Sequence, residues 1–454
     1  MDTSDKLAAL NRPSPTMQEL LDRDPGGAPP ELREVSHVDL GTGGISVAAY
    51  TDPAFHRAEI EAMWSRVWQM ACREEEISEP GDHVLYEIGK KSVIVARGTD
   101  GAIRGFHNVC RHRGRRLRDG DGHAEQFRCA YHGFAWDLNG DLARFPSEWD
   151  FPQIDKCKFG LKTVRTACWG GFVFVNFDPD ACSLQEYLEG LPEMFRRWPL
   201  EARYISAYVS KELECNWKIA QEAFIESFHT TDTHPQDAPW IGDEFSQYDT
   251  WPDKKHINRM IVPRGLASPS QGTWSEADIL RSSEHTIVPQ VLPEGSTARH
   301  EMARRKRERL TKANGHDYSA VSDAEMIDTV QYLVFPNLVF WWGHGSYICY
   351  RFRPVGESAD RCLMDVFYLS PIPAGAARPE PARRHFLSDA QRWTDAAELA
   401  RLGGVFEQDV SNVTAIQKGL SSGVLEEVVL SRYQENRIRH YHRTLGEYLA
   451  KGKR

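Results

Sequence analysis

Two short groups of metal-binding residues constrain this sequence more than any other feature. Cys110-Arg111-His112 is followed, after sixteen residues, by Cys129-Ala130-Tyr131-His132. Each group supplies one thiolate and one imidazole, so together they can surround a metal with two sulfur and two nitrogen ligands. Gly114 follows the first group and Gly133 the second, and glycine lets a loop bend tightly around a bound group. The spacing therefore predicts a metal centre built from two similar loops.

Two kinds of site use such a ligand set. Structural zinc usually pairs Cys with Cys and His with His along the chain, whereas each group here mixes the two. A two-iron, two-sulfide centre with Cys on one iron and His on the other matches the mixed pairs. We predict a [2Fe-2S] cluster as the cofactor, held by Cys110, His112, Cys129 and His132. Structural zinc, or four unrelated core residues, are the alternatives.

A second set of candidate ligands lies in residues 217–234, which we expect to be helical. Glu226 and His229 are three residues apart and so share a helix face, and His234 follows near the helix end. Asp409, on a later predicted helix, offers the carboxylate that two imidazoles need to hold one cation. His229, His234 and Asp409 would form a two-His, one-carboxylate triad, which leaves positions on Fe(II) open. Taken alone, the same residues also suit a capping histidine and a solvated acid.

Both sets of residues resemble one protein family. The stretch from Cys110 to Trp136 resembles the cluster motif of Rieske-type non-haem iron, aromatic ring-hydroxylating oxygenases, and residues 216–235 with 409–420 resemble the catalytic domain of their alpha subunit. The resemblance runs from about Tyr50 to His442. It implies an α+β fold, with an N-terminal Rieske [2Fe-2S] β-sandwich domain followed by a helix-grip (START/Bet v1-like) catalytic domain with an antiparallel sheet. It also implies that Cys110 and Cys129 share one iron, and His112 and His132 the other.

Composition and turn signals suggest where the domains divide. We expect an N-terminal arm over 1–44, rich in Pro, Gly and Asp, a Rieske domain over 45–175, and a catalytic mononuclear iron domain over 176–454. Hairpin signals lie within the Rieske domain. The catalytic domain should contain the helix already described, polar loops over 255–300, a solvated charged helix over 300–310, four strands between 329 and 369, and helices from 382 onward.

The resemblance implies a terminal oxygenase of aromatic hydrocarbon catabolism. Electrons from NAD(P)H would arrive through a separate reductase, with or without a ferredoxin, because the chain has no dinucleotide fingerprint after a strand. Mononuclear Fe(II) would then use O₂ to hydroxylate or cis-dihydroxylate an aromatic or other hydrophobic substrate. Oxidative O- or N-demethylation and alicyclic hydroxylation are alternatives within the class. A Rieske electron-transfer protein without oxygenase activity, or a zinc-stabilised binding protein, would belong to other classes.

The family assembles as a ring of three catalytic subunits, with or without a β subunit, and this implies a role for Glu226. Its carboxylate would connect His132 of one subunit to His229 of the next, so we assign it to the catalytic machinery. The alternative is a surface acid paired with Lys218 or another cation. Many relatives have Asp in place of Glu226, and Ala223 and Gln408 stand where Asn and Glu are common. We expect neither of these last two residues to touch a proposed metal ligand.

Length, charge and composition exclude several other classes of protein. The 454 residues suffice for two domains, and a net charge of −10 argues against general nucleic-acid binding. No apolar run approaches a membrane span, and the first residues lack a secretory signal, so we expect a cytoplasmic protein with no membrane contact. The nine scattered cysteines fit reduced thiols. Five arginines crowd the first cluster loop and could attract an acidic ferredoxin or form hydrogen bonds at a subunit interface: Arg111, Arg113, Arg115, Arg116 and Arg118.

Overall fold

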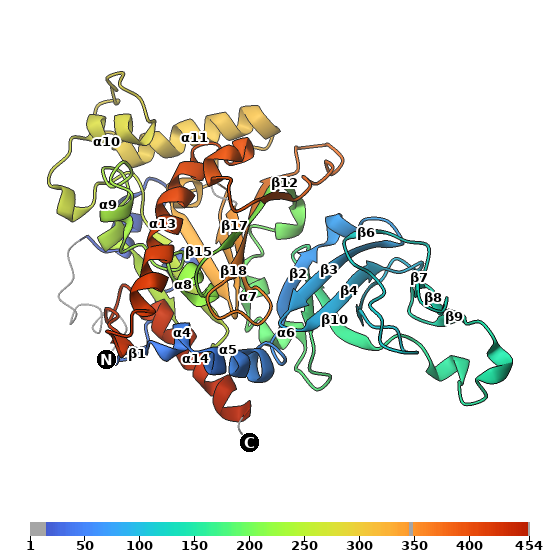
Figure 1. Ribbon diagram of the computed structural model, residues 1–454. Helices are drawn as coiled ribbons and strands as arrows, with labels where there is room; N and C mark the ends of the chain where they lie inside the picture. The colour runs from blue at the N-terminus through green and yellow to red at the C-terminus, as the bar shows by residue number, and fades with distance from the viewer. Residues whose placement is uncertain (1–14, 345–347, 453–454) are drawn as a thin grey trace.

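The computed structural model describes residues 15–344 and 348–452. The first fourteen residues of the predicted arm, and the first residue of the strand predicted over 347–352, lie outside the described residues. Figure 1 shows two bodies side by side, a smaller one made of strands β2 to β11 and a larger one of mixed helix and sheet. The α+β fold class with an N-terminal β domain is confirmed.

The smaller body contains two antiparallel sheets. A seven-stranded sheet has the order β2-β11-β10-β5-β4-β3-β6, and a three-stranded sheet has the order β7-β8-β9. The predicted hairpins are present: β3 and β4 join at Gly89, where φ is +54°, and β8 and β9 join at Asn139-Gly140. The strands are β2 (Gln69–Arg73), β3 (Asp82–Ile88), β4 (Lys91–Arg97), β5 (Ile103–His107), β6 (Gly122–His123), β7 (Phe127–Arg128), β8 (Ala135–Trp136), β9 (Leu142–Arg144), β10 (Thr163–Trp169) and β11 (Phe172–Asn176).

The larger body is built on an eight-stranded sheet of order β13-β14-β15-β16-β17-β18-β12-β19. Its neighbouring strands are antiparallel, except that the edge strand β19 runs parallel to β12. The four strands predicted between 329 and 369 form its centre. The strands are β12 (Arg203–Leu213), β13 (Gln247–Thr250), β14 (Ile257–Val262), β15 (Thr329–Val334), β16 (Leu338–Trp342), β17 (Ile348–Pro354), β18 (Cys362–Pro371) and β19 (His385–Leu387).

Helices cover this sheet. Helix α8 packs on β17 and β18, α13 packs on α8, and Figure 1 shows α13 lying across the sheet. The helices are α2 (Met17–Arg23), α3 (Pro30–Arg33), α4 (Ala48–Thr51), α5 (Pro53–Ala58), α6 (Leu184–Tyr187), α7 (Leu191–Met194), α8 (Trp217–Glu222), α9 (Thr230–Thr233), α10 (Glu276–Ser283), α11 (Ala298–Asn314), α12 (Asp323–Ile327), α13 (Leu402–Leu420) and α14 (Asn436–Gly452). In the described part of the chain, no helix is long and apolar enough to cross a membrane.

Four local predictions were wrong. Residues 217–234 are not one helix, because the chain leaves the helix after Glu222 and re-forms a single turn as α9. Residues 257–262, predicted as polar loop, form the fully buried strand β14. The charged helix predicted over 300–310 is solvated only in part, because Arg304 and Arg309 are exposed but Glu301 is buried in an ion pair with Arg304. The region after 382 includes the strand β19 and short 3-10 turns.

The segment before the smaller body lies against the larger one. Strand β1 (Ile45–Ser46) pairs with β20 (Glu427–Val428), and a π-helical turn at Glu59–Met63 packs on α14. Within this contact, Glu59 and Lys218 form an ion pair of 2.7 Å in which both side chains are 0% exposed. Lys218 therefore does not pair with Glu226, and Lys218 as the partner of Glu226 was wrong.

Candidate metal centres

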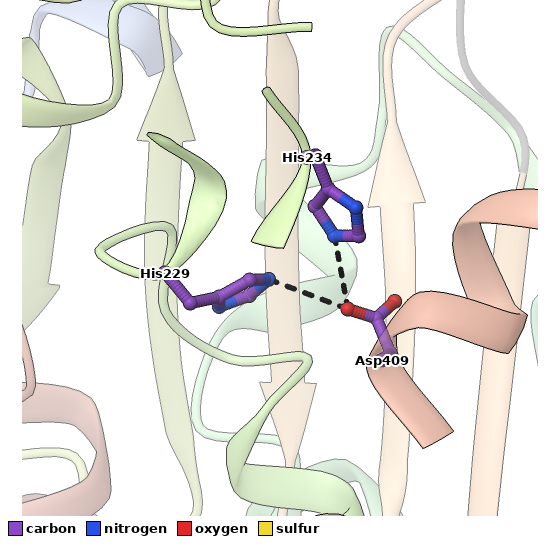
Figure 2. A group of neighbouring side chains, drawn as sticks. All are labelled: His229, His234 and Asp409. Carbon is purple, nitrogen blue, oxygen red and sulfur yellow. Dashed lines mark ion pairs between the residues drawn. The ribbon is translucent and has the colours of Figure 1, made fainter. Parts of the chain in front are cut away.

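Three side chains predicted as ligands meet at one point on the larger body. His229 and His234 flank the single turn α9, and Asp409 projects from α13 (Figure 2). The Oδ1 atom of Asp409 lies 2.9 Å from Nε2 of His234 and 3.5 Å from Nε2 of His229. One ligand atom from each residue fits within 4.8 Å of the others. The short α9 turn thus brings both imidazoles to the same carboxylate.

The triad has the properties of a cation site. Oδ1 of Asp409 is buried and accepts no hydrogen bond, although two imidazole nitrogens lie close to it. A buried carboxylate oxygen without a donor costs free energy unless a cation satisfies it. Two imidazoles with one carboxylate suit Fe(II), and they leave open positions around the metal. These residues therefore fit the mononuclear iron that the sequence predicts.

In each of the two histidines, the ring nitrogen that points away from Asp409, Nδ1, contacts a side-chain oxygen of another residue. Oε1 of Glu226 lies 2.5 Å from Nδ1 of His229, and Oε1 of Gln408 lies 2.9 Å from Nδ1 of His234. An acceptor at Nδ1 keeps the proton there, so the Nε2 lone pair faces the triad centre. We expected Gln408 to touch no proposed ligand, and that expectation was wrong. Its position next to Asp409 in the sequence was the available signal.

The break in the helix follows from the same glutamate. The Glu226 carboxylate accepts hydrogen bonds from the backbone N–H groups of Phe228 and His229. A side chain that binds nearby backbone donors competes with the helical hydrogen bonds. Glu226 therefore fixes both the loop before α9 and the ring orientation of His229.

The electrostatics of the triad favour a bound positive charge. Burial lowers the pKa of His229, but the carboxylates of Glu226 and Asp409 outweigh it and raise this pKa to about 9. For His234, burial is likewise outweighed, chiefly by Asp409, and its pKa is also raised. A metal at the triad would take the place of a proton on these rings.

The four predicted cluster ligands meet at the tip of the smaller body. The two loops repeat one hydrogen-bond pattern. The N–H of Cys110 donates to Arg115 O, and that of Cys129 donates to Phe134 O, while Gly114 and Gly133 donate back to the cysteine carbonyls. Both glycines are left-handed, with φ of +78° and +75°. These conformations are costly for residues with a Cβ, which explains the glycine after each group.

The side chains at this tip form a mixed pair of ligands. Cys110 and Cys129 are each 2% exposed, and the rings of His112 and His132 lie 4.7 Å apart. Nδ1 of His112 is buried with no hydrogen-bond partner. Burial raises the pKa of Cys110; for Cys129 burial is outweighed by hydrogen bonds, first that of the Tyr131 N–H, and the pKa falls. Two thiols and two imidazoles, one lacking a partner, fit a Rieske cluster.

Some of the five arginines around this tip form hydrogen bonds with nearby backbone carbonyls. Arg111 donates to the carbonyls of Lys158 and Gly160, and Arg118 donates to the carbonyl of Gln126. The remaining three, Arg113, Arg115 and Arg116, are exposed. The first two arginines therefore brace the fold within the chain; Arg116 pairs with Glu87, and Arg113 and Arg115 leave positive charge at the surface.

A cavity of about 130 Å³ opens beside the triad. Its walls come from the segment 223–227 after α8, from α9, from β14–β17 and from α13, so no single stretch of sequence could identify it. The aromatic and aliphatic lining includes Phe224, Trp240, Val262, Trp341, Tyr350 and Phe406. Arg264 and Arg401 also line it, and no motif in the sequence pointed to either residue. Figure 1 shows that β7–β9, near the four cluster residues, lie at the far end of the molecule from α9 and α13.

Two family models match this chain. The Rieske [2Fe-2S] domain matches residues 67–155, and the ring hydroxylating alpha subunit (catalytic domain) matches residues 195–451. Together these models imply a Rieske cluster and a mononuclear iron.

Curated relatives align over part of their length. The biphenyl 2,3-dioxygenase alpha subunit of Rhodococcus jostii (strain RHA1) is 34% identical over 220 residues, which is 47% of each chain. The chlorobenzene dioxygenase alpha subunit of Cupriavidus sp. (strain PS12) is 35% identical over 43% of this chain and 45% of that protein. The carnitine monooxygenase oxygenase subunit of Escherichia coli (strain K12) is 32% identical over 51% of this chain and 61% of that protein. The chain thus spans about half the length of the curated relatives it matches.

Solved structures share the fold over nearly the whole chain. The quaternary ammonium Rieske monooxygenase CntA in complex with L-carnitine aligns with a TM-score of 0.63 and 19% identity, over 90% of this chain and 96% of that one. Naphthalene 1,2-dioxygenase with indole bound aligns with a TM-score of 0.61 and 19% identity, over 92% and 94%.

Proposed function

Because this chain belongs to the family of ring hydroxylating alpha subunits that carry a Rieske [2Fe-2S] domain, we propose that it is the terminal oxygenase component of a Rieske non-haem iron enzyme. It hydroxylates or cis-dihydroxylates an aromatic or other hydrophobic substrate with O₂. The observation that carries the proposal is the convergence of His229, His234 and Asp409 beside an apolar cavity. An electron carrier has no need of such a site.

In this proposal the smaller body receives electrons. Cys110, Cys129, His112 and His132 hold the cluster, and a separate reductase, with or without a ferredoxin, supplies electrons from NAD(P)H. Support comes from the exposed cations Arg113 and Arg115, which suit an acidic redox partner. The nine cysteines form no disulfide, which agrees with a cytoplasmic location.

In the larger body, His229, His234 and Asp409 hold the mononuclear iron. That iron, when bound, supplies the activation of dioxygen. Glu226 and Gln408 accept the Nδ1 protons of the two histidines and so keep each Nε2 aimed at the metal position. Phe224, Phe406 and the other apolar walls hold the substrate beside the triad and exclude water.

The arrangement calls for more than one copy of the chain. The two centres lie at opposite ends of one molecule, so we propose a homotrimer in which the tip of one subunit meets the triad of the next. Glu226 would then connect the neighbour's His132 to His229. Two exposed apolar side chains support this contact: Tyr131 beside the cluster ligands is 57% exposed, and Phe228 beside Glu226 is 51% exposed.

We further propose the domain division 1–44, 45–175 and 176–454. The family match that begins at residue 67 supports the Rieske assignment. The contact of β1 with β20 means that the first part of this domain also touches the catalytic body.

The experiment is product analysis by mass spectrometry under ¹⁸O₂. The iron-loaded protein receives electrons from a reductase and is offered a panel of aromatic acids, polycyclic hydrocarbons and methoxyaromatics. We expect ¹⁸O in a product, and two ¹⁸O atoms distinguish dihydroxylation from monohydroxylation. The similarity to a carnitine monooxygenase subunit makes oxidative demethylation the second candidate, which formaldehyde release would reveal. Reduction and reoxidation of the cluster with no labelled product from any compound would contradict the oxygenase.

A further inference from the structure

One arginine in the cavity beside the triad has no anionic partner. Nε and Nη2 of Arg264 both donate to the Thr329 hydroxyl, at 3.1 and 2.7 Å. Among the described residues, Nη1 donates no hydrogen bond and no carboxylate forms an ion pair with this guanidinium. Its faces lie against aromatic rings, 5.2 Å from the centre of Trp240 and 5.6 Å from that of Trp341. The charge is thus held rigidly at the wall of the cavity.

The other arginine in this wall, Arg401, is neutralised by a carboxylate. Arg401 binds both carboxylate oxygens of Asp237, at 2.9 and 3.2 Å. The backbone N–H of Arg264 donates to the Asp328 carboxylate, but the charge of that carboxylate is paired with Arg299. Burial lowers the pKa of Arg264 and nearby Arg401 lowers it further, and the more distant carboxylates of Asp237 and Asp328 raise it without offsetting the burial. A buried cation of this kind is stabilised when a ligand brings the missing charge.

Hydrogen-bond donors also outnumber acceptors around Arg264. The indole N–H groups of Trp240 and Trp341 are buried and have no acceptor among the described residues. Both tryptophans line the cavity. A ligand that carries only acceptors at this position would satisfy several donors at once.

We propose that the substrate is an aromatic carboxylic acid, whose carboxylate binds Arg264 while its ring lies among the apolar walls next to the triad. This inference rests on the proposed function, because it takes the cavity as the substrate site. A carboxylate matches the planar guanidinium and accepts from its free Nη1. Phe224, Val262 and Phe406 supply apolar walls for a ring. The same Arg264 disfavours a quaternary ammonium group at this position.

Calorimetry of ligand binding to the full iron-loaded chain tests the assignment. The probes are benzoate, 4-hydroxybenzoate and 2-naphthoate, each compared with its uncharged primary amide, and choline as a cation. We expect at least one acid to bind roughly tenfold or more tightly than its amide, with no binding of choline. In Arg264→Gln the preference for that acid should disappear while the amide binds as before.

Three further variants distinguish recognition of the carboxylate by Arg264 from a general effect on folding. Arg264→Lys should retain part of the preference, and Thr329→Val should weaken it by loosening the guanidinium. Arg309→Gln removes an exposed arginine of α11, with the same change in net charge, and should leave the preference intact. The inference is wrong if no acid outbinds its amide, or if Arg264→Gln keeps the preference. Acid binding without any ¹⁸O-labelled product would instead contradict the proposed function alone.

Discussion

The side-chain oxygen of Gln408 lies 2.9 Å from Nδ1 of His234 and also accepts a hydrogen bond of 2.9 Å from the amide of Gln236. This contact fixes His234 with its Nε2 toward Asp409. Gln408, next in sequence to the proposed ligand Asp409, therefore orients the proposed ligand His234, which comes from another segment. It is a positioning contact, because Gln408 itself does not line the cavity.

Loss of this contact should weaken the mononuclear iron site. We expect Gln408→Leu to lower the affinity for iron at the triad by roughly tenfold to a hundredfold, because the ring of His234 loses its acceptor. Gln408→Glu keeps an acceptor and should bind iron at least as well as the wild type. Iron competition with a chelator measures the difference. Equal iron affinity in all three proteins would contradict the positioning role.

The two metal centres should be separable by mutation. We expect His229→Ala, His234→Ala and Asp409→Ala each to reduce iron from about three atoms per chain to about two, while the visible absorption of the cluster persists. Cys129→Ser should remove the visible absorption but leave the triad able to bind Fe(II). Iron analysis with absorption spectra checks both. Full iron content in the triple triad variant would mean that no second site exists.

A mixture of inactive chains should regain activity if electrons cross between subunits. Neither Cys129→Ser nor Asp409→Ala should turn over substrate alone, since each lacks one centre. In co-expressed mixed trimers, an intact cluster lies next to the intact triad of a neighbour, and product formation should return. Glu226→Gln in the chain with the intact triad should slow this turnover. No recovery in trimers verified by native mass spectrometry would argue for transfer within one chain.

The buried pair Lys218–Glu59 should matter to stability. Lys218→Met leaves the Glu59 carboxylate buried without its cation, and we expect a loss of roughly 3–5 kcal/mol in the free energy of unfolding. The double variant Lys218→Met/Glu59→Leu should recover most of that loss. Chemical unfolding followed by fluorescence measures it. The matched surface control is Lys90→Met, which breaks the exposed pair with Glu357 and should cost under roughly 1 kcal/mol.

Acid should destabilise the larger body through His440. This side chain is 1% exposed, with Nε2 3.0 Å from the Lys254 carbonyl, and burial lowers its pKa to about 4. Between pH 6.5 and 4 this imidazole is protonated in the unfolded state but stays neutral in the folded state. The free energy of unfolding therefore falls as the pH falls. We expect a contribution of up to roughly 3 kcal/mol across this window.

Unfolding in urea at pH 7.5 and 5.0 measures that slope. His440→Gln keeps a donor but cannot be protonated, and its unfolding free energy should depend less on pH. His123→Gln changes an exposed histidine and serves as the control. An unchanged slope in His440→Gln would show that other groups cause the acid sensitivity.

The sequence alone determined the ligand types, their spacing and much of the sheet. Cys110-x-His112 and Cys129-x-x-His132 lie in short loops, and their chemistry depends on neighbours a few residues apart, so a local pattern was enough to predict them. The central strands, from 329 to 369, were likewise visible because β-branched and aromatic runs alternate with turn residues.

Only the tertiary structure decided how the catalytic site is assembled. Glu226 broke the helix predicted over 217–234 by binding the backbone of Phe228 and His229, a competition that periodicity does not register. Strand β14 looked polar in sequence, yet its Arg259 is buried against Asp249 from the neighbouring strand. The guanidinium of Arg264 lacks an anionic partner for the opposite reason, because no carboxylate within the described part of the chain forms an ion pair with it. Whether a charge is paired depends on residues distant in the chain, and only folding brings those together.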